Sequence, residues 1–322
     1  MPDSPAPQLK PPVLAPVVVN WNGAADTIAC LESLWGAEPR PSRVVVVDNG
    51  STDNSVGDIE RWARATGIET TPRPEGATGR SGAWLTLIVA AANRGFAGGN
   101  NIGLEYLRRE TDATHLLLLN NDATVAKDFF AELGRALEAR PDAGLLTGTI
   151  FEHPARDRVW YAGGREIRSR ALIAHLYDIP SGNEPIETEF VSGCVMLISR
   201  QALERIGPLA ECYFPLYMED AEYSVRVRRA GLPVLYAPAV KAYHKVGATV
   251  GKAETSPLIT RAQVRHRVLY VRRNFPFAQR AVALSYLAVT KPVKALLETV
   301  SGRPKIGWAV FRGMIEGFAY RS

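Results

Sequence analysis

Polar side chains follow three apolar runs in the first half of the chain, at the point where each run ends. Short apolar runs that alternate with amphipathic segments are typical of buried strands in a parallel sheet. Ligands of such sheets bind at the carboxyl ends of the strands, so we expect these polar residues to share one site. They are Asp48 after the run 43–47, Asn93 after 84–90, and Asn120, Asn121 and Asp122 after 115–119.

The segment 46–53, Val-Val-Asp-Asn-Gly-Ser-Thr-Asp, carries two carboxylates on either side of a glycine turn. Asp48 and Asp53 can accept hydrogen bonds from a nucleoside base or from ribose hydroxyls. The same residue types also suit a structural Asx turn, in which Ser51 or Asp53 caps the next helix. The sequence leaves both interpretations open.

A glycine-rich segment, Asn-Arg-Gly-Phe-Ala-Gly-Gly-Asn-Asn, runs from Asn93 to Asn101. Glycines ahead of a helix let the backbone approach a diphosphate, whose charge the helix N-terminus favours. The segment has neither the Gly-x-Gly-x-x-Gly spacing of dinucleotide-binding folds nor the Lys-Ser/Thr of a phosphate-binding P-loop. The alternative is an ordinary tight turn between a strand and a helix.

Two residues can bind a divalent cation. Hard cations such as Mg²⁺ and Mn²⁺ prefer carboxylate oxygen, so Asp122 is the natural ligand. His244 ends a short apolar run, 240–243, and can add a neutral imidazole. The structural alternatives are that Asp122 caps the next helix and that His244 is an ordinary buried histidine.

Glu219 and Asp220 stand together at the start of a predicted helix, 219–230. A carboxylate that faces a cleft can act as a general base towards an attacking hydroxyl. Acidic residues in a first helical turn also stabilise the helix dipole without any catalytic role.

The repeated order of strand and helix predicts an α/β fold with a parallel sheet and right-handed crossovers. In the first half we expect strands at 13–19, 43–47, 84–90 and 115–119 and helices at 24–35, 55–65, 97–109 and 126–139, with a surface loop at 67–82. In the second half we expect strands at 144–150, 159–163, 190–199, 234–236 and 240–243, irregular structure at 164–185, and helices at 200–206, 219–230, 256–274 and within 277–322.

The charge is unevenly distributed along a chain whose 46% hydrophobic and 22% charged residues are ordinary for a globular protein. From Lys241 to the end there are 15 basic and 3 acidic residues, whereas the whole chain has a net charge of +5. This asymmetry predicts an anionic partner. A basic amphipathic tail with Trp308, Phe311, Phe318 and Tyr320 favours a membrane surface; the alternative is packing of these helices on the domain.

Three cysteines without metal-binding or redox spacing fit a reducing cytosol. Residues 1–12 are proline-rich and predict a disordered leader rather than a signal peptide. No apolar run is long enough to predict a membrane-spanning helix. Nucleic acid is not an expected partner, because no recognised nucleic-acid motif accompanies the basic charge.

Five blocks in this order resemble family 2 glycosyltransferases, most closely the branch described as rhamnosyltransferase-like. They are 18–23, 47–53, 93–101, 119–122 and 219–220, within a resemblance that runs from about 13 to 275. The resemblance implies a GT-A α/β domain over 13–275, with a nucleotide-sugar half (13–122) and an acceptor half (123–275). The amphipathic helical tail, 276–322, follows it.

The activity that the resemblance implies is inverting transfer of a sugar from a nucleoside-diphosphate sugar, dTDP-rhamnose or a UDP-hexose, to a hydroxyl. The acceptor would be a saccharide or a lipid-linked saccharide in cell-surface polysaccharide or glycolipid synthesis, on the cytoplasmic face of the membrane. Two other classes share nucleotide-binding sheets. A nucleotidyltransferase would bring Lys or Arg to a triphosphate after the first strand, where residues 20–23 read Asn-Trp-Asn-Gly. A non-catalytic nucleotide-binding scaffold would not need the acidic residues and His244 together.

The resemblance also implies roles for single residues. Asp220 would be the catalytic base with Glu219 beside it, and Asp122 and His244 would hold Mg²⁺ or Mn²⁺. The donor would contact Asn20, Asn22, Asp48, Asn49, Asp53, Asn93, Gly95, Phe96, Gly98, Asn100, Asn101, Asn121 and Gly193. The sequence departs from the family pattern at Asn120, where the usual Asp-x-Asp has its first aspartate, and at 72–82, which resembles an insertion.

Overall fold

The computed structural model describes residues 11–70, 72–245 and 256–320, so most of the expected leader lies outside the described residues. The N-terminal half contains the parallel strands β1 (Leu14–Asn20), β2 (Val44–Asp48), β4 (Leu85–Val89) and β5 (His115–Asn120). The helices α1 (Ala24–Trp35), α2 (Ser55–Ala65) and α3 (Gly95–Glu110) connect these strands. The predictions for these four strands and three helices are confirmed to within two residues.

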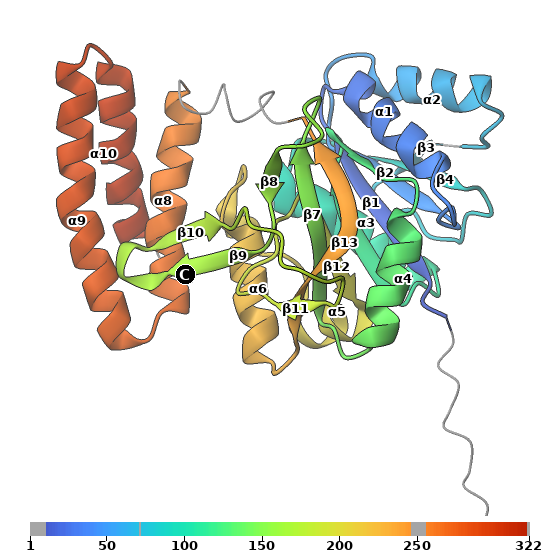
Figure 1. The fold of residues 1–322 in the computed structure, drawn as a ribbon. Helices are drawn as coiled ribbons and strands as arrows, with labels where there is room; N and C mark the ends of the chain where they lie inside the picture. The colour runs from blue at the N-terminus through green and yellow to red at the C-terminus, as the bar shows by residue number, and fades with distance from the viewer. Residues whose placement is uncertain (1–10, 71, 246–255, 321–322) are drawn as a thin grey trace, which may run out of the picture.

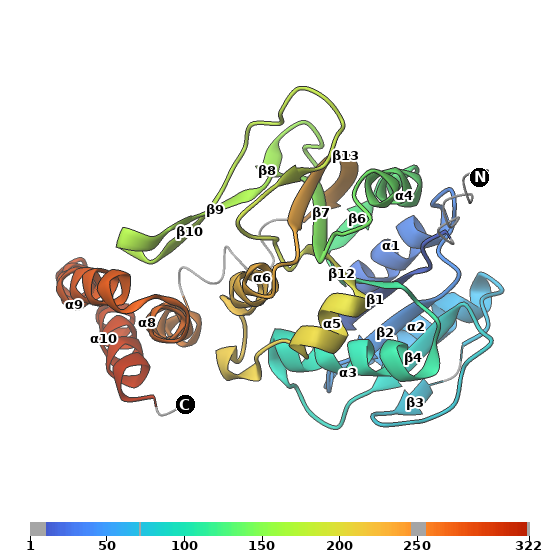
Figure 2. The same ribbon diagram turned by 90° about the horizontal axis from the view of Figure 1, so that it is seen from below.

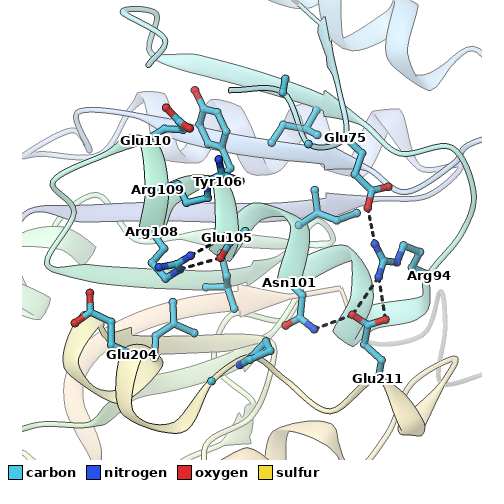
Figure 3. A pocket seen from close by; sticks show the side chains of 18 residues that line it. Glu75, Arg94, Asn101, Glu105, Tyr106, Arg108, Arg109, Glu110, Glu204 and Glu211 are labelled. Carbon is cyan, nitrogen blue, oxygen red and sulfur yellow. Dashed lines mark hydrogen bonds and ion pairs between the residues drawn. The ribbon is translucent and has the colours of Figure 1, made fainter. Parts of the chain in front are cut away.

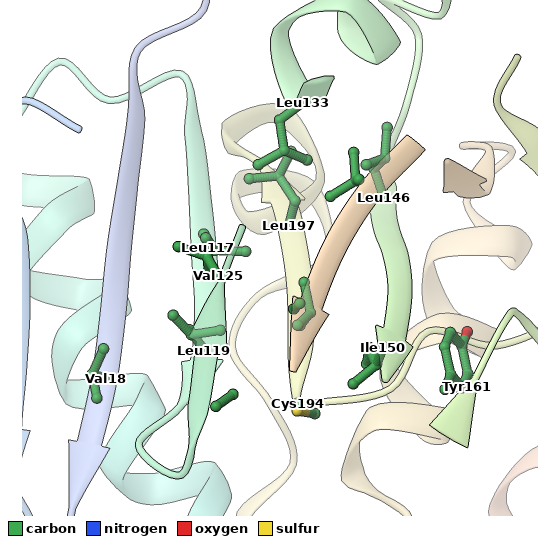
Figure 4. Close-up of a cluster of buried hydrophobic side chains, with 14 of the residues drawn as sticks. Val18, Leu117, Leu119, Val125, Leu133, Leu146, Ile150, Tyr161, Cys194 and Leu197 are labelled. Atoms are coloured by element: carbon green, nitrogen blue, oxygen red, sulfur yellow. The ribbon is translucent and has the colours of Figure 1, made fainter. Parts of the chain in front are cut away.

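Alternate residues of these strands face opposite layers of helices, as the pleat requires. Val18, Leu117 and Leu119 pack in the cluster that includes α1 and α2 (Figure 4), whereas Val17, Leu116 and Leu118 pack with α3. Helix α3 lies close to β1 because Gly103 has no side chain: a Cβ there would lie 2.4 Å from Cγ1 of Val17. This close approach fixes the N-terminus of α3 beside the carboxyl end of β1.

The second half extends the same sheet beyond β5. β12 (Val195–Ser199) is antiparallel to β5 and to β7 (Leu145–Glu152), and β13 (Val234–His244) is parallel to β7. Short strands β6 (Ala123–Val125) and β11 (Ile186–Glu187) pair with β13, and β8 (Val159–Tyr161) pairs with β7. Helix α4 (Phe129–Ala139) packs with the α1 layer, and α5 (Arg200–Ile206) and α6 (Glu219–Arg229) pack with the α3 layer. The sheet is mixed and has helices on both faces (Figures 1 and 2), which confirms the predicted class.

Three boundary predictions are wrong. The loop expected at 67–82 contains β3 (Pro72–Pro74), which lies at the sheet edge parallel to β4, where proline is tolerated because one side of the strand has no partner. The two strands expected at 234–236 and 240–243 are one strand, β13, with an irregularity between Ala237 and Lys241. The helix expected from 126 begins at Phe129, because the chain first pairs with β13 as β6.

The segment 164–185 is also more ordered than expected. It contains an antiparallel hairpin, β9 (Gly164–Ile167) and β10 (Leu172–His175), joined by the short helix η1 (Arg168–Arg170). Every residue of β10 is half-buried, so the hairpin lacks the alternation of apolar and polar residues that reveals a strand.

Helices α8 (Pro257–Asn274), α9 (Phe277–Val300) and α10 (Pro304–Ala319) confirm the predicted helices and the predicted break near 301–304. They lie side by side at one end of the molecule (Figures 1 and 2). In the parts of the chain that the structure describes, no helix combines the length and apolarity needed to cross a bilayer. The proposed boundary between domain and tail at 275 and 276 stays a prediction.

Candidate active site

A cleft of about 480 Å³ lies at the carboxyl ends of β1 and β5, bounded by the start of α6 and by the β9–β10 hairpin. It brings together most of the residues singled out from the sequence: Asn49, Asn93, Gly95, Phe96, Asn100, Asn121, Asp122, Gly193, Glu219, Asp220 and His244. The others do not line it: Asn20, Asn22, Asp48, Asp53, Gly98 and Asn101.

Asp48 is buried behind the cleft and holds a turn. Its Oδ1 accepts a hydrogen bond from the backbone N–H of Ser51 at 3.0 Å, and its Oδ2 accepts one from Ser51 Oγ at 2.7 Å and one from Asn20 Nδ2 at 2.8 Å. Asn20 in turn accepts a hydrogen bond from Thr27 Oγ1 at 2.7 Å. These contacts match the Asx-turn interpretation, and they make Asp48 a residue that shapes the wall of the site.

Asn22 and Asp53 continue this turn at the rim. Asn22 has a positive φ of 51°, and its Oδ1 accepts hydrogen bonds from the backbone N–H groups of Thr52 at 2.8 Å and Asp53 at 3.3 Å. Asp53 Oδ1 accepts a hydrogen bond from Ser55 N at 3.0 Å, at the start of α2. Asp53 is exposed, so it remains open to a ligand that approaches from the rim.

Asn49 organises the glycine-rich segment. Its Nδ2 donates to Gly95 O at 3.0 Å and to Asn93 Oδ1 at 3.2 Å, and its Oδ1 accepts from Arg94 N at 3.0 Å. Gly95 has a φ of +71°, and a Cβ there would lie 2.6 Å from Pro215 O, so only glycine fits this position. Phe96 N donates to the same carbonyl at 2.8 Å, which ties the segment to the loop before α6.

The remaining glycines and Asn101 serve packing. A Cβ on Gly98 would lie 2.6 Å from Cβ of Arg94, and one on Gly99 would lie 2.8 Å from Cγ1 of Val19. Asn101 points away from the cleft: its Nδ2 donates to Leu209 O at 2.9 Å, and its Oδ1 accepts from Leu209 N at 2.9 Å. It lines a second cavity, beside Arg94 and its ion-pair partners Glu75 and Glu211 (Figure 3).

Asp122 and His244 meet across two strand ends. The antiparallel pairing of His244 with Ala123 brings His244 Nε2 within 3.1 Å of Asp122 Oδ1. Both side chains are largely buried, and Asp122 Oδ1 and His244 Nδ1 have no hydrogen-bond partner among the described residues. Residues 11–70, 72–245 and 256–320 contain no group of three or more acidic, histidine or cysteine side chains arranged for a metal. The pair therefore offers one carboxylate and one imidazole, and a divalent cation there would need further oxygen ligands from substrate or water.

Glu219 and Asp220 occupy different environments although they are neighbours. Asp220 Oδ2 accepts a hydrogen bond from Gly193 N at 3.0 Å, and its Oδ1 accepts one from Ala221 N at 2.8 Å. Burial raises the pKa of Asp220, and these two N–H groups oppose that rise. Burial and the charge of Asp220 raise the pKa of Glu219 well above its usual range, and Glu219 Oε2 has no hydrogen-bond partner in the described structure. Asp220 is therefore the member of the pair that keeps its charge.

The turn before α6 is strained in a way that places these carboxylates. Tyr217 and Met218 have positive φ values of 82° and 79°, a conformation that side-chain-bearing residues rarely adopt. Such strain persists only where surrounding contacts impose it, and it is frequent at functional sites. Gly193, whose N–H donates to Asp220, has no room for a side chain, because a Cβ there would lie 2.8 Å from Cζ of Phe96.

Sequence reasoning missed several aromatic residues of the cleft, among them Trp160 and His175. Trp160 packs edge-on against His244 and against His175, with ring centroids 4.7 Å and 4.6 Å apart. The ring of His175 is held by a 3.1 Å hydrogen bond between Nδ1 and Trp160 O, and burial lowers its pKa. His175 lies in the hairpin expected to be irregular, so no periodic pattern could have marked it.

The match to known families covers most of the chain. Residues 11–267 match the family described as glycosyltransferase like family 2. The low-salt glycan biosynthesis hexosyltransferase Agl10 of Haloferax volcanii is 24% identical over 239 residues, which is 72% of this chain and 66% of Agl10. The N-acetylglucosaminyl-diphospho-decaprenol L-rhamnosyltransferase of Mycobacterium tuberculosis is 25% identical over 283 residues, which is 80% of this chain and 83% of that protein. The matched region thus spans just under two thirds of Agl10.

Solved structures share the fold at low sequence identity. The mannosyltransferase PcManGT from Pyrobaculum calidifontis, in complex with GDP-Man and Mn²⁺, has a TM-score of 0.57 and 18% identity, over 97% of this chain and 88% of that chain. GalNAc-T7 with UDP, GalNAc and Mn²⁺ has a TM-score of 0.60 and 14% identity, over 81% of this chain and 47% of that chain. These likenesses confirm the GT-A fold, and because the family match extends over 11–267, the chain belongs to glycosyltransferase family 2.

Proposed function

We propose that this chain is an inverting glycosyltransferase that moves a sugar from a nucleoside-diphosphate sugar to an acceptor hydroxyl. The observation that carries the proposal is that Asp122, His244 and Asp220 line one cleft at the carboxyl ends of the strands. A single displacement needs a proton acceptor on one side of the anomeric carbon and charge stabilisation of the departing diphosphate on the other. The cleft offers residues for both.

Asp220 takes the proton of the attacking hydroxyl in this proposal. Its carboxylate is oriented by the N–H groups of Gly193 and Ala221, so it is held in position before the acceptor arrives. The hydroxyl then attacks the anomeric carbon from the face opposite the diphosphate, and the configuration inverts. Glu219 is buried beside Asp220, and the rise in its pKa favours its neutral form, which places no second negative charge next to the Asp220 carboxylate.

Asp122 and His244 would hold Mg²⁺ or Mn²⁺. The donor set fits, because a hard carboxylate oxygen without a hydrogen-bond partner lies 3.1 Å from an imidazole nitrogen. When bound, the cation supplies positive charge to the leaving diphosphate. PcManGT and GalNAc-T7 were both solved in complex with Mn²⁺, which supports the same choice here.

The proposed donor is dTDP-rhamnose, with UDP-hexoses as the second choice, because relatives are named rhamnosyltransferase and hexosyltransferase. Direct contacts to the donor would come from Asn49, Asn93, Asn121 and the exposed Trp21, which line the cleft. Asp48 and Asn20 do not line the cleft, and they would contribute by holding the turn that shapes the nucleoside pocket.

The proposed acceptor is a lipid-linked saccharide at an anionic membrane surface, because the mycobacterial relative is named for a diphospho-decaprenol acceptor. We place the chain on the cytoplasmic side, since Cys30, Cys194 and Cys212 are all free thiols.

The test is release of nucleoside diphosphate from a panel of nucleotide sugars in Mn²⁺ or Mg²⁺, with and without a lipid-linked acceptor. We expect release from one donor, lost with EDTA and in Asp122→Ala. Release of pyrophosphate from a nucleoside triphosphate in the presence of a sugar 1-phosphate would identify a nucleotidyltransferase instead. If the purified chain bound no donor in calorimetry, the non-catalytic scaffold would replace the enzyme as the better interpretation.

A further inference from the structure

Helices α9 and α10 expose large apolar side chains along one side. On α9 they recur at alternating steps of four and three residues, which keeps them on one face of the helix: Val282, Tyr286, Val289, Val293, Leu296 and Val300. On α10 the same kind of spacing gives Trp308, Phe311, Ile315 and Phe318. We call these ten side chains the outer face. Their exposure is high, for example 66% for Val289, 64% for Leu296 and 59% for Trp308.

One side of each helix is packed against the protein, so the outer face is held in place. Ala283, Leu287 and Ala295 of α9 are buried. A Cβ on Gly307 of α10 would lie 2.5 Å from Ala295 O, which shows how closely the two helices approach. A Cβ on Gly313 would lie 2.4 Å from Arg261 O, so α10 is equally close to α8. Helices α8, α9 and α10 lie beside one another at one end of the molecule (Figures 1 and 2). The spacing of the outer-face residues puts them on the side of α9 and of α10 opposite to the buried residues of each helix.

Several arginine side chains of α8 form hydrogen bonds or ion pairs within the protein. Arg267 donates to Ala171 O at 2.6 Å and ties α8 to the β9–β10 hairpin, and Arg272 donates to Gly317 O at 2.8 Å and ties α8 to α10. Arg261 forms an ion pair with Glu316. Helix α8, which precedes the tail, is therefore tied both to the hairpin and to α10.

A smaller set of cations borders the outer face. Lys294, Arg303, Lys305 and Arg312 are exposed on α9, α10 and the turn between them. The two carboxylates in the described part of these helices are engaged: Glu298 pairs with Arg303, and Glu316 pairs with Arg261 and Arg312. The border is thus basic around an apolar centre.

We propose that the outer face is a docking surface for an anionic lipid bilayer, on which α9 and α10 lie flat. The apolar side chains would enter the boundary between headgroups and acyl chains, and the bordering cations would contact anionic headgroups. Exposed apolar side chains that gather on one face of a helix mark interaction sites on folded proteins. This inference deepens the membrane part of the proposed function, and it can hold even if the proposed sugar transfer fails.

A second copy of the chain is the competing occupant. Apolar residues at alternating steps of three and four also form the seam of helical bundles. A symmetric dimer through the outer face would, however, bring the basic border of one copy near that of the other, and like charges in proximity are repulsive. A bilayer with anionic headgroups offers the complementary charge, so the charges favour the bilayer.

Vesicle flotation of the full-length chain tests this choice. We expect flotation with vesicles that contain phosphatidylglycerol, and weaker but measurable flotation with pure phosphatidylcholine, because insertion of apolar side chains contributes most. The double variant Val289→Asp/Leu296→Asp should lower the vesicle partition coefficient by about tenfold or more. Both positions are exposed, so the fold should persist, which circular dichroism checks. Tyr177→Asp, at an equally exposed apolar residue outside the outer face, is the matched control and should float like the unmodified chain.

Two outcomes would overturn the proposal. One is failure of the expected flotation pattern: either the unmodified chain floats with neither kind of vesicle, or the double variant floats as well as the unmodified chain. The other is that sedimentation shows a dimer that the double variant dissociates, without vesicle binding, which would assign the face to a second copy. Release of nucleoside diphosphate from a water-soluble donor should be equal in the variant and the unmodified chain, so a failure of the proposed transfer is seen separately.

Discussion

Two regions differ in how fully their buried polar atoms are hydrogen-bonded: the turn at Asp48, behind the cleft, and the surroundings of Asp122 and Glu219, within it. Around Asp48, both carboxylate oxygens, Asn20 and Ser51 all find partners within the protein. Around Asp122 and Glu219, two buried atoms, Glu219 Oε2 and His244 Nδ1, have no hydrogen-bond partner among the described residues, and Asp122 Oδ1 has its 3.1 Å contact with His244 Nε2 in place of a regular hydrogen bond.

The difference teaches which region is built for shape and which for chemistry. A buried polar atom without a partner costs about 1–3 kcal/mol, so a protein retains one only where something else is gained. The satisfied region around Asp48 gives the wall its form. The unsatisfied region keeps polar atoms available to a ligand that arrives later. Substitutions in the two regions should therefore fail in different ways.

The largest effect is expected for Asp220→Asn, next to the unsatisfied Glu219. Asparagine keeps the size of the side chain and cannot take a proton, so sugar transfer should fall by about 10²–10⁴-fold. Donor affinity, measured by calorimetry, should change little, because the base faces the acceptor. Asp178→Asn, on the exposed loop after β10, is the matched control. Normal sugar transfer by Asp220→Asn would show that another residue is the catalytic base.

Asp122→Ala should come next in size. Loss of the carboxylate removes the charged ligand of the proposed cation site, so the affinity for nucleoside diphosphate in Mn²⁺ should fall by roughly 10–100-fold. In EDTA the variant and the unmodified chain should bind equally weakly. Asp128→Ala, an exposed aspartate just before α4, should leave the Mn²⁺ titration unchanged. Equal Mn²⁺ dependence in both variants would contradict the assignment of Asp122.

The fold was largely predictable where burial is complete. Val44, Val45, Val46 and Val47 of β2 are all buried, so a continuous apolar run marks the strand without ambiguity. Asp122 and His244 were placed together because each ends such a run, and the register of β6 and β13 joins them. The β9–β10 hairpin was not predictable, because the half-buried strand β10 carries no periodic signal, and His175 was missed with it. Trp160 lies in the predicted strand β8, and nothing in the sequence of that strand marked it as a cleft residue.

The glycine-rich segment shows a second limit of sequence reasoning. Successive residues of a helix point about 100° apart, so neighbours rarely face the same cleft. Asn100 lines the cleft, whereas Asn101 bonds the backbone of Leu209 on another side of α3. The composition of the segment predicted a binding loop. The helical geometry decides which of its residues line the cleft and which contact neighbouring parts of the protein.

A loss of stability rather than of chemistry is expected for Asp48→Ala. The substitution removes the acceptor of both the Ser51 hydroxyl and the Ser51 backbone N–H, and it leaves the buried Asn20 amide with Ser51 Oγ as its remaining acceptor, at about 1–3 kcal/mol for each unsatisfied group. Urea denaturation should show this fall in the free energy of unfolding. Asp58→Ala, which removes a solvent-exposed ion pair with Arg61, should cost about 1 kcal/mol or less. Equal stability of the two variants would break the distinction between a shaping region and a reacting region.

The smallest effect should separate Asn93 from Asn101. Asn93 lines the cleft, and its Oδ1 holds the N–H of Gly95 at 2.7 Å, so Asn93→Ser should weaken donor binding by a factor of about 5–10, equivalent to one ordinary hydrogen bond. Asn101→Ser should bind donor like the unmodified chain and lose only stability, because its contacts to Leu209 join α3 to the segment after α5. Calorimetry of the bound nucleotide sugar and thermal melting give the two quantities on the same samples. If Asn101→Ser weakened donor binding as much as Asn93→Ser, the donor would have to reach past α3 into the second cavity, and the division of the segment into cleft and packing residues would be wrong.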